Sequence, residues 1–205
     1  MILIIDFGSQ VTQLIARRLR DAGFYSEIVP STSDCNEHIE KKPKGIILSG
    51  WPNSVTKVDT PRAPDIIWNG IPILGICYGQ QTLCEQLGGK VEANTKREFG
   101  RARLEVIAEC PLFHNLPKET DFDVWMSHGD HVSELPDGFS VVARSTGAPF
   151  AAIADGERNY YGVQFHPEVV QTTGGSQILE NFAKLICKCV PNWSMAAYKI
   201  QAIDG

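Results

Sequence analysis

Two short segments, far apart in the chain, carry the residue types of nucleophilic catalysis. Residues 75–81 read Gly-Ile-Cys-Tyr-Gly-Gln-Gln and place Cys77 between two glycines, whereas residues 162–168 end in His166, a proline and Glu168. A cysteine attacks as its thiolate, a histidine can take its proton, and a carboxylate can hold the imidazole in the required tautomer. The sequence therefore predicts a catalytic triad of Cys77, His166 and Glu168.

The segments on either side of the cysteine indicate how it is held. The apolar run 71–74 predicts a short buried strand, and residues 78–87 predict a helix that a pair of glycines ends. Cys77 is expected at the sharp turn between them, where flanking glycines permit close backbone approach and the helix N-terminus favours a thiolate. A tight turn around a buried structural cysteine is the alternative, and the distant histidine and glutamate argue against it.

The histidine follows a strand-like run. Residues 160–165 predict a strand, and Pro167 favours an extended conformation at His166. In an extended chain, residues two apart project to the same side, so His166 and Glu168 can meet.

A third segment supplies backbone donors. Residues 49–52, Ser-Gly-Trp-Pro, follow the apolar strand signal 45–48. Main-chain N–H groups in such a turn can face an oxyanion. Active sites of open α/β sheets lie at the carboxyl ends of the strands, so the three segments are expected to converge there.

Strand and helix signals alternate along the first half of the chain, which is typical of an α/β fold with an open, mostly parallel, twisted sheet and helices on both faces. From residue 101 onward the strand signals follow one another more closely and predict a mixed or antiparallel C-terminal portion. A last amphipathic helix is expected to cover the core. The strand signals are 2–5, 25–29, 45–48, 71–74, 104–108, 122–125, 141–143, 151–154 and 160–165, and the buried side of the last helix carries Ile178, Leu179, Phe182, Leu185 and Ile186.

Length and composition fit a single enzyme domain. With 205 residues and 43% hydrophobic content the chain can bury one substantial core. We expect one domain over residues 1–190, with residues 191–205 as a tail or the start of a linker.

Charge and cysteine usage narrow the class further. The net charge of -5 and the lack of a basic stripe argue against a nucleic-acid partner. No apolar run is long enough to span a membrane and no signal segment is visible, so we expect a cytoplasmic protein with no membrane partner. The six cysteines lack paired spacing and are interpreted as reduced thiols, of which Cys77 alone is expected to be exposed and ionised.

On these residues the chain resembles the class I (triad) glutamine amidotransferases, whose flavodoxin-like glutaminase domains share a cysteine turn, a distant His-x-Glu and a glycine-rich oxyanion turn. The resemblance covers nearly the whole chain. Residues 6–10, Asp-Phe-Gly-Ser-Gln, and residues 125–130, Trp-Met-Ser-His-Gly-Asp, are similar to the GMP synthase branch of that family. One residue departs from it, because relatives have Gly-Gly-Pro in the oxyanion turn and this chain has Trp51 at the second glycine.

The resemblance implies that the chain hydrolyses the side-chain amide of glutamine to glutamate and ammonia through a thioester on Cys77. It implies an oxyanion hole made by the backbone N–H groups of Trp51 and Tyr78. It also assigns the binding of glutamine to Gly50, Gln81, Ser127, His128, Gly129 and Asp130, the last four in a loop. No cofactor is expected for this reaction. His128 and His131 are not accompanied by a matching ligand set, so no metal is expected.

The resemblance also implies a partner. In GMP synthase the ammonia passes to an ATP-pyrophosphatase synthetase domain that adenylates xanthosine monophosphate (XMP), and ATP and magnesium belong to that domain. This sequence contains no Ser-Gly-Gly-x-Asp-Ser phosphate loop. We therefore expect an excised domain or a separate glutaminase subunit that works with such a domain.

Three alternatives stay open at this point. The chain can serve another amidotransferase, such as one for anthranilate, histidine or carbamoyl phosphate synthesis. It can be a cysteine peptidase or γ-glutamyl hydrolase of the same fold, or a binding module that has kept the fold.

A charged segment flanks Phe99 and Gly100. Residues 96–98 and 101–103 are either solvated charges or an edge to which a partner docks.

Overall fold

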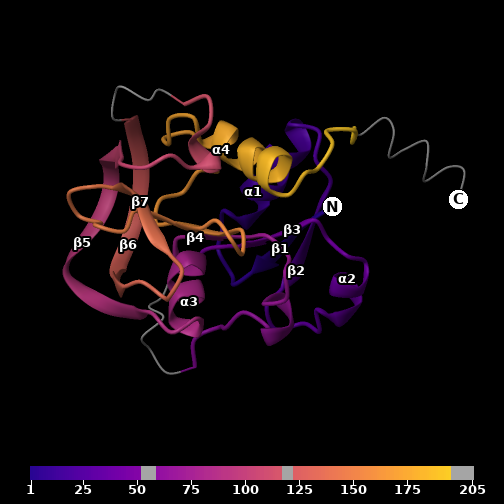
Figure 1. Ribbon diagram of the computed structural model, residues 1–205, viewed down its shortest axis with the longest axis horizontal. Helices are drawn as coiled ribbons and strands as arrows, with labels where there is room; N and C mark the ends of the chain where they lie inside the picture. The colour runs from indigo at the N-terminus through magenta and orange to yellow at the C-terminus, as the bar shows by residue number, and fades with distance from the viewer. Residues whose placement is uncertain (52–58, 117–121, 195–205) are drawn as a thin grey trace, which may run out of the picture.

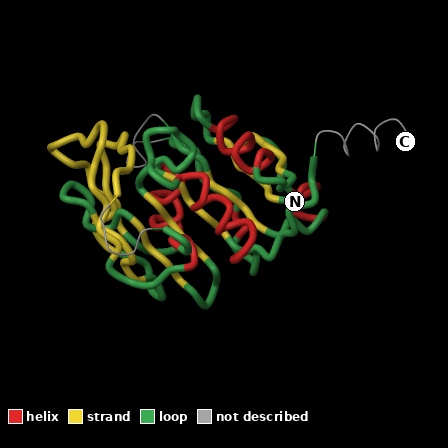
Figure 2. Tube along the Cα trace, turned by 90° about the horizontal axis from the view of Figure 1, so that it is seen from above, coloured by secondary structure: helices red, strands yellow, loops and turns green. Residues whose placement is uncertain are grey.

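The computed structural model describes residues 1–51, 59–116 and 122–194. One nine-stranded sheet runs through the molecule in the order β2-β1-β3-β4-β9-β8-β7-β5-β6. Helices pack on both of its faces, as Figures 1 and 2 show. The expected fold class, an α/β sheet with a parallel and an antiparallel portion, is confirmed.

The parallel half of the sheet holds the candidate site. Its strands pair in parallel from β2 through β9. The inner strands are apolar along nearly their whole length because helices cover both faces of the sheet. These strands are β1 (Ile2–Asp6), β2 (Ser26–Pro30), β3 (Gly45–Leu48), β4 (Ile73–Ile76) and β9 (Tyr160–Val163).

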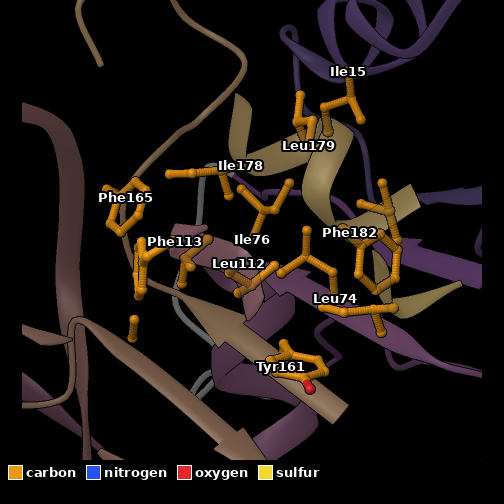
Figure 3. Packing of buried hydrophobic residues seen from close by; sticks show 14 of the residues in the cluster. Ile15, Leu74, Ile76, Leu112, Phe113, Tyr161, Phe165, Ile178, Leu179 and Phe182 are labelled. Atoms are coloured by element: carbon orange, nitrogen blue, oxygen red, sulfur yellow. The ribbon is translucent and has the colours of Figure 1, made fainter. Parts of the chain in front are cut away.

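Two helical layers enclose the sheet. Helices α1 (Thr12–Asp21) and α4 (Gly175–Asn181), the latter continued by a π-helical turn, Phe182–Ile186, share one apolar cluster with the sheet. Figure 3 shows residues of this cluster packed between α1, α4 and the strands. Helix α3 (Tyr78–Gln86) packs on the opposite face in a second cluster. Alternate residues of β1, β3 and β4 point into one cluster or the other, as the pleat of a strand requires.

The antiparallel half is longer than the sequence predicted. Its strands are β5 (Lys90–Val106), β6 (Phe122–Glu134), β7 (Ser140–Arg144) and β8 (Ala152–Asp155), and it begins at residue 90 and not at 101. The prediction that residues 127–130 form a loop was wrong, because they lie inside β6. Buried and half-buried positions alternate along β6 as far as Ser133. The buried positions pass from apolar residues to His128 and Asp130, and this change resembles the end of a strand.

Several connections between strands contain only a short helical piece. Helix α2 (Asn36–Glu40) links β2 to β3 and was not predicted, because it buries no residue and so shows no apolar stripe. A 3-10 turn, Asp65–Ile67, precedes β4, and another, Pro111–Phe113, precedes β6.

The chain after α4 lies back on the domain up to residue 194. The N–H of Trp193 donates to the carbonyl of Gly23 over 2.9 Å, and its ring packs on Tyr25 at 6.3 Å between centroids. Residues 195–205, the rest of the predicted tail, lie outside the described residues. Within the described part of the chain, no helix is long and apolar enough to cross a membrane.

Candidate active site

Cys77 lies at the strand-to-helix turn between β4 and α3, where the sequence placed it. Its φ is 55° and its ψ is -109°, a conformation that costs a residue other than glycine about 1–3 kcal/mol. The N–H of Cys77 donates to the carbonyl of Val163 on β9 over 2.8 Å, and its carbonyl accepts from the N–H of Gln81. The turn is therefore anchored to the sheet on one side and to α3 on the other.

The glycines on either side of the turn are required for close packing. A Cβ on Gly75 would lie 2.6 Å from the backbone carbonyl of Gly79, and a Cβ on Gly79 would lie 2.2 Å from the carbonyl oxygen of Leu48. Real Cβ atoms do not approach backbone atoms this closely. The Gly-x-Cys-x-Gly pattern thus lets α3 start directly against β3 and β4.

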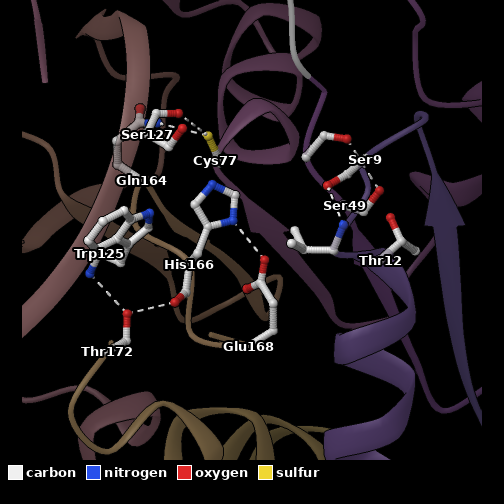
Figure 4. A network of polar contacts seen from close by, with 12 residues as sticks. Ser9, Thr12, Ser49, Cys77, Trp125, Ser127, Gln164, His166, Glu168 and Thr172 are labelled. Carbon is white, nitrogen blue, oxygen red and sulfur yellow. Dashed lines mark hydrogen bonds and ion pairs between the residues drawn. The ribbon is translucent and has the colours of Figure 1, made fainter. Parts of the chain in front are cut away.

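His166 and Glu168 meet, as the sequence predicted, but not along an extended strand, because β9 ends at Val163, residues 164–165 form a bend and residues 167–168 a turn. The Nδ1 of His166 lies 2.7 Å from Oε1 of Glu168, which fixes the Nδ1–H tautomer. The other ring nitrogen faces Cys77 (Figure 4). Burial alone would lower the pKa of His166, but the negative charge and hydrogen bond of Cys77, together with those of Glu168, raise it well above 6.5. These two neighbours therefore favour the protonated form of His166.

The expectation that Cys77 is exposed was wrong. Cys77 is buried and only 5% exposed, because β6 and the segment after β9 cover the sulfur. The other five cysteines are free thiols whose pKa values are raised, mainly by burial, to about 12 for Cys84 and about 11 for Cys110. The ionisation of Cys77 stays a prediction.

Two groups that the sequence did not single out as neighbours contact the sulfur. The Sγ of Cys77 lies 3.5 Å from the carbonyl oxygen of Ser127 and 3.5 Å from Nε2 of Gln164. Sequence reasoning missed Gln164. The available signal was its place in the sequence, two residues before His166 and four before Glu168.

The backbone of His166 is clamped by β6 and by a threonine. The N–H of His166 donates to the carbonyl of Trp125 over 3.0 Å. The hydroxyl of Thr172 donates to the carbonyl of His166 over 2.6 Å and accepts from the N–H of Trp125 (Figure 4). On the other side of the triad, Nε of Arg18 donates to the backbone carbonyl of Glu168. No sequence pattern indicated these contacts.

The predicted oxyanion turn reaches the site. A Cβ placed on Gly50 would lie 3.5 Å from Cε1 of His166, so the turn after β3 borders the imidazole. The indole of Trp51 lies over Gly8 and packs on Tyr78 at 6.4 Å between ring centroids. Tyr78 is the first residue of α3, directly after Cys77. The donation of the Trp51 and Tyr78 N–H groups to an oxyanion stays a prediction, and Pro52 lies outside the described residues.

The residues expected to bind glutamine do not all lie at the sulfur of Cys77. The carbonyl of Ser127 contacts the sulfur directly. Gln81 reaches it through Gln164, because Nε2 of Gln81 donates to Oε1 of Gln164 and to the carbonyl of Asp130, each over 3.1 Å. His128 turns away toward Glu98, whose Oε2 lies 3.0 Å from its Nε2. Gly50 borders His166, and Gly129 is a half-buried residue of β6.

The carboxylate of Asp130 is a further polar group of the site. Its Oδ2 is buried and meets no donor among the described residues, which leaves it available for a cationic group. In the part of the chain that the structure describes, no three His, Cys, Asp or Glu side chains are grouped to hold a metal ion.

A sharp cysteine turn, a buried His–Glu pair and an α/β sheet that brings them together define a triad hydrolase or amidotransferase. The family model for glutamine amidotransferase class-I matches residues 3–186, and the chain belongs to this family.

The relatives point to one branch of it. The chain is 57% identical over its full length to GMP synthase [glutamine-hydrolyzing] of Brucella melitensis and covers 41% of that protein. It is 32% identical to a crystal structure from Thermoplasma acidophilum that is provisionally described as one subunit of GMP synthase, with a TM-score of 0.80 and coverage of 98% of this chain and 96% of that one. The fold is shared with the PurLQS structure of Thermotoga maritima at 19% identity and a TM-score of 0.71, over 90% of this chain and 97% of that one.

Proposed function

We propose that this chain hydrolyses the side-chain amide of glutamine and releases ammonia for a synthetase that converts XMP to GMP. The observation that carries the proposal is the strained Cys77 at the head of α3, facing a His166 that is bound to Glu168. The identity of 57% to GMP synthase [glutamine-hydrolyzing] supports the GMP branch over the other amidotransferases.

The first half of the reaction forms a thioester. The Cys77 thiolate attacks the amide carbon of glutamine and a C–S bond forms, while the carbonyl electrons move to oxygen. Backbone N–H groups of Trp51 and Tyr78 stabilise that oxyanion. The oxyanion then collapses and the C–N bond breaks. The imidazolium of His166 protonates the leaving nitrogen, which departs as ammonia.

The second half releases glutamate. Neutral His166 takes a proton from water, the hydroxide adds to the thioester carbon, and the sulfur leaves as a thiolate. The imidazolium and thiolate are thereby restored. Glu168 holds the ring in place through its 2.7 Å contact with Nδ1 and stabilises the imidazolium that recurs in each cycle.

The buried carboxylate of Asp130 and the amide of Gln81 offer groups for the amino-acid end of glutamine. An α-ammonium fits an unpaired carboxylate because an ion pair offsets its desolvation. No cofactor takes part in these steps. ATP and magnesium act in the ATP-pyrophosphatase synthetase domain, which receives the ammonia. We expect the reaction to take place in the cytoplasm.

A peptidase or γ-glutamyl hydrolase of this fold would have the same triad and is distinguished by its substrate. The test measures ammonia and glutamate released from free glutamine by the chain alone and with a purified XMP-aminating synthetase domain from a relative. We expect release of both products, which Cys77→Ser abolishes, and an increase when the synthetase, XMP and ATP are added. Turnover of γ-glutamyl peptides in preference to glutamine would contradict the proposal.

A further inference from the structure

Gln164 lies against the nucleophile in a buried position. It follows β9, it is 1% exposed, and its backbone N–H donates to the carbonyl of Ala151 over 2.8 Å. Its side-chain nitrogen lies 3.5 Å from the sulfur of Cys77, a distance that suits an N–H···S hydrogen bond. Figure 4 shows the amide beside the sulfur, on the side away from Glu168.

A series of hydrogen bonds fixes which end of the amide faces the sulfur. The carbonyl of Asp130 can only accept, so Gln81 must present its NH₂ group there. The same nitrogen of Gln81 lies 3.1 Å from Oε1 of Gln164, which must accept as well. The oxygen of Gln164 is therefore held by Gln81, and the nitrogen of Gln164 points to Cys77.

The protonation state of Cys77 decides how it uses its two polar neighbours. A neutral thiol can donate to the carbonyl of Ser127, 3.5 Å away. A thiolate would be repelled by that oxygen and needs a donor, and Gln164 supplies one besides His166. A fixed donor in a buried site interacts strongly with an anion because water does not screen it.

We propose that Gln164 is a further catalytic residue, whose side-chain amide donates a hydrogen bond to the Cys77 sulfur and holds it as a thiolate. The same donor acts twice in the cycle. It stabilises the thiolate before the C–S bond forms, and it receives the sulfur again when water cleaves the thioester and the electron pair of the C–S bond returns to sulfur. The inference rests on the proposed glutaminase function, but its main test does not require glutamine.

The test compares Gln164→Met, which keeps the length of the side chain and removes the donor, with the unmodified chain. Alkylation of Cys77 by iodoacetamide is followed from pH 5 to 10 by peptide mass mapping. Because one hydrogen bond to a charged group changes an equilibrium by about 10 to 100-fold, the pH of half-maximal labelling should rise by about one to two units. With glutamine as substrate, kcat should fall more than KM rises.

The matched control is Gln80→Met on α3. Gln80 is equally buried, and its amide donates to the carbonyl of Phe150, not to Cys77. This change should lower thermal stability without moving the labelling profile. Gln164→Glu provides a second variant if Gln164→Met does not fold, since it keeps the acceptor for Gln81 and should also slow labelling at pH 7.

An unchanged labelling profile in a folded Gln164 variant would overturn the proposal and leave Gln164 with a packing role. A shifted profile in a chain that hydrolyses no glutamine would sink the proposed function and leave the contact to Cys77 standing. The two failures are therefore distinguishable.

Discussion

Cys77 combines two features that are unfavourable in an ordinary core residue, a positive φ and a sulfur surrounded by polar groups. Neither improves packing, and each makes sense if the sulfur must be aimed at a substrate and ionised. These two features of Cys77 are therefore explained by its role in the reaction and not by packing of the core. The other buried cysteines contrast with it in having no part in the triad, and burial raises the pKa of each and leaves it an inert thiol.

Covalent labelling follows from this contrast. A glutamine analogue with an electrophile at the amide position should modify Cys77 alone among the six cysteines. Burial raises the pKa of Cys84 to about 12, and Cys84 is fully buried, so it should not react at neutral pH. Half-buried Cys110 and Cys189 serve as internal controls for non-specific alkylation. Peptide mapping measures the outcome, and modification of Cys84 ahead of Cys77 would refute the assignment of the nucleophile.

A second expectation at this scale concerns Glu168→Gln. The change keeps the shape of the side chain and removes the charge that stabilises the imidazolium, so kcat should fall by about 10² to 10⁴-fold. Burial lowers the pKa of His166, whereas Cys77 and Glu168 raise it, so the loss of the Glu168 charge must lower it. The alkaline limb of the kcat/KM profile should accordingly move to lower pH. An unchanged kcat would exclude Glu168 from the triad.

Among the elements, the strands and helix that carry the triad were predictable, because each has a local signature. Strands β3 and β4 are short apolar runs, and α3 begins at Tyr78, directly after Cys77 and within the Gly-x-Cys-x-Gly pattern. The length of β6 was not predictable, because its buried face continues through His128 and Asp130. Glu98 meets the His128 ring and Gln81 meets the Asp130 carbonyl, and only the fold brings these partners near.

Contacts between distant residues are also the part of the site that the sequence did not predict. The residue types cysteine, histidine and glutamate suggest a catalytic role by themselves, whereas a glutamine does not. The contacts of Gln164 with Gln81 and Cys77 span 83 and 87 residues of sequence. Thr172, which clamps His166, is likewise an ordinary residue until β6 lies beside it.

The packing of α3 against β3 provides a test of the turn. Gly79→Ala would place a Cβ 2.2 Å from the carbonyl oxygen of Leu48, so α3 must move and Cys77 with it. Overpacking of this kind costs about 1–3 kcal/mol, which urea unfolding can measure, and glutamine hydrolysis should fall as well. Gly156→Ala is the control, because a Cβ there meets nothing within 4 Å and should change stability by less than about 0.5 kcal/mol. Equal stability of the two variants would contradict the close approach.

At the scale of the whole molecule, the chain spans about two fifths of the length of the curated relatives that it matches. The triad lies at the carboxyl ends of the parallel strands β4 and β9. Strand β6 of the antiparallel half brings Ser127 and Trp125 to the same site. The site is therefore assembled from both halves of the sheet. A partner that shifts β6 relative to β4 would change the surroundings of Cys77 and of His166 together.

Trp51 is the residue through which such control can be tested. Its indole fills the space over Gly8 and against Tyr78, and a ring held on two sides restricts the turn that must direct its N–H at the oxyanion. We predict that the isolated chain has an incompletely formed oxyanion hole and weak basal glutaminase activity, which a liganded synthetase domain raises. One missing donor costs about 10² to 10³-fold in kcat.

Trp51→Gly should then raise basal activity and reduce the activation by the synthetase, as steady-state ammonia release with and without the partner would show. Trp68→Gly controls for the loss of a packed indole, because Trp68 lies on Tyr160 at the first residue of β9, before the strand reaches the triad. That control should lose stability and keep the native activation ratio. Full activity in the unmodified isolated chain, unaffected by Trp51→Gly, would mean that the hole is already formed and that Trp51 only packs.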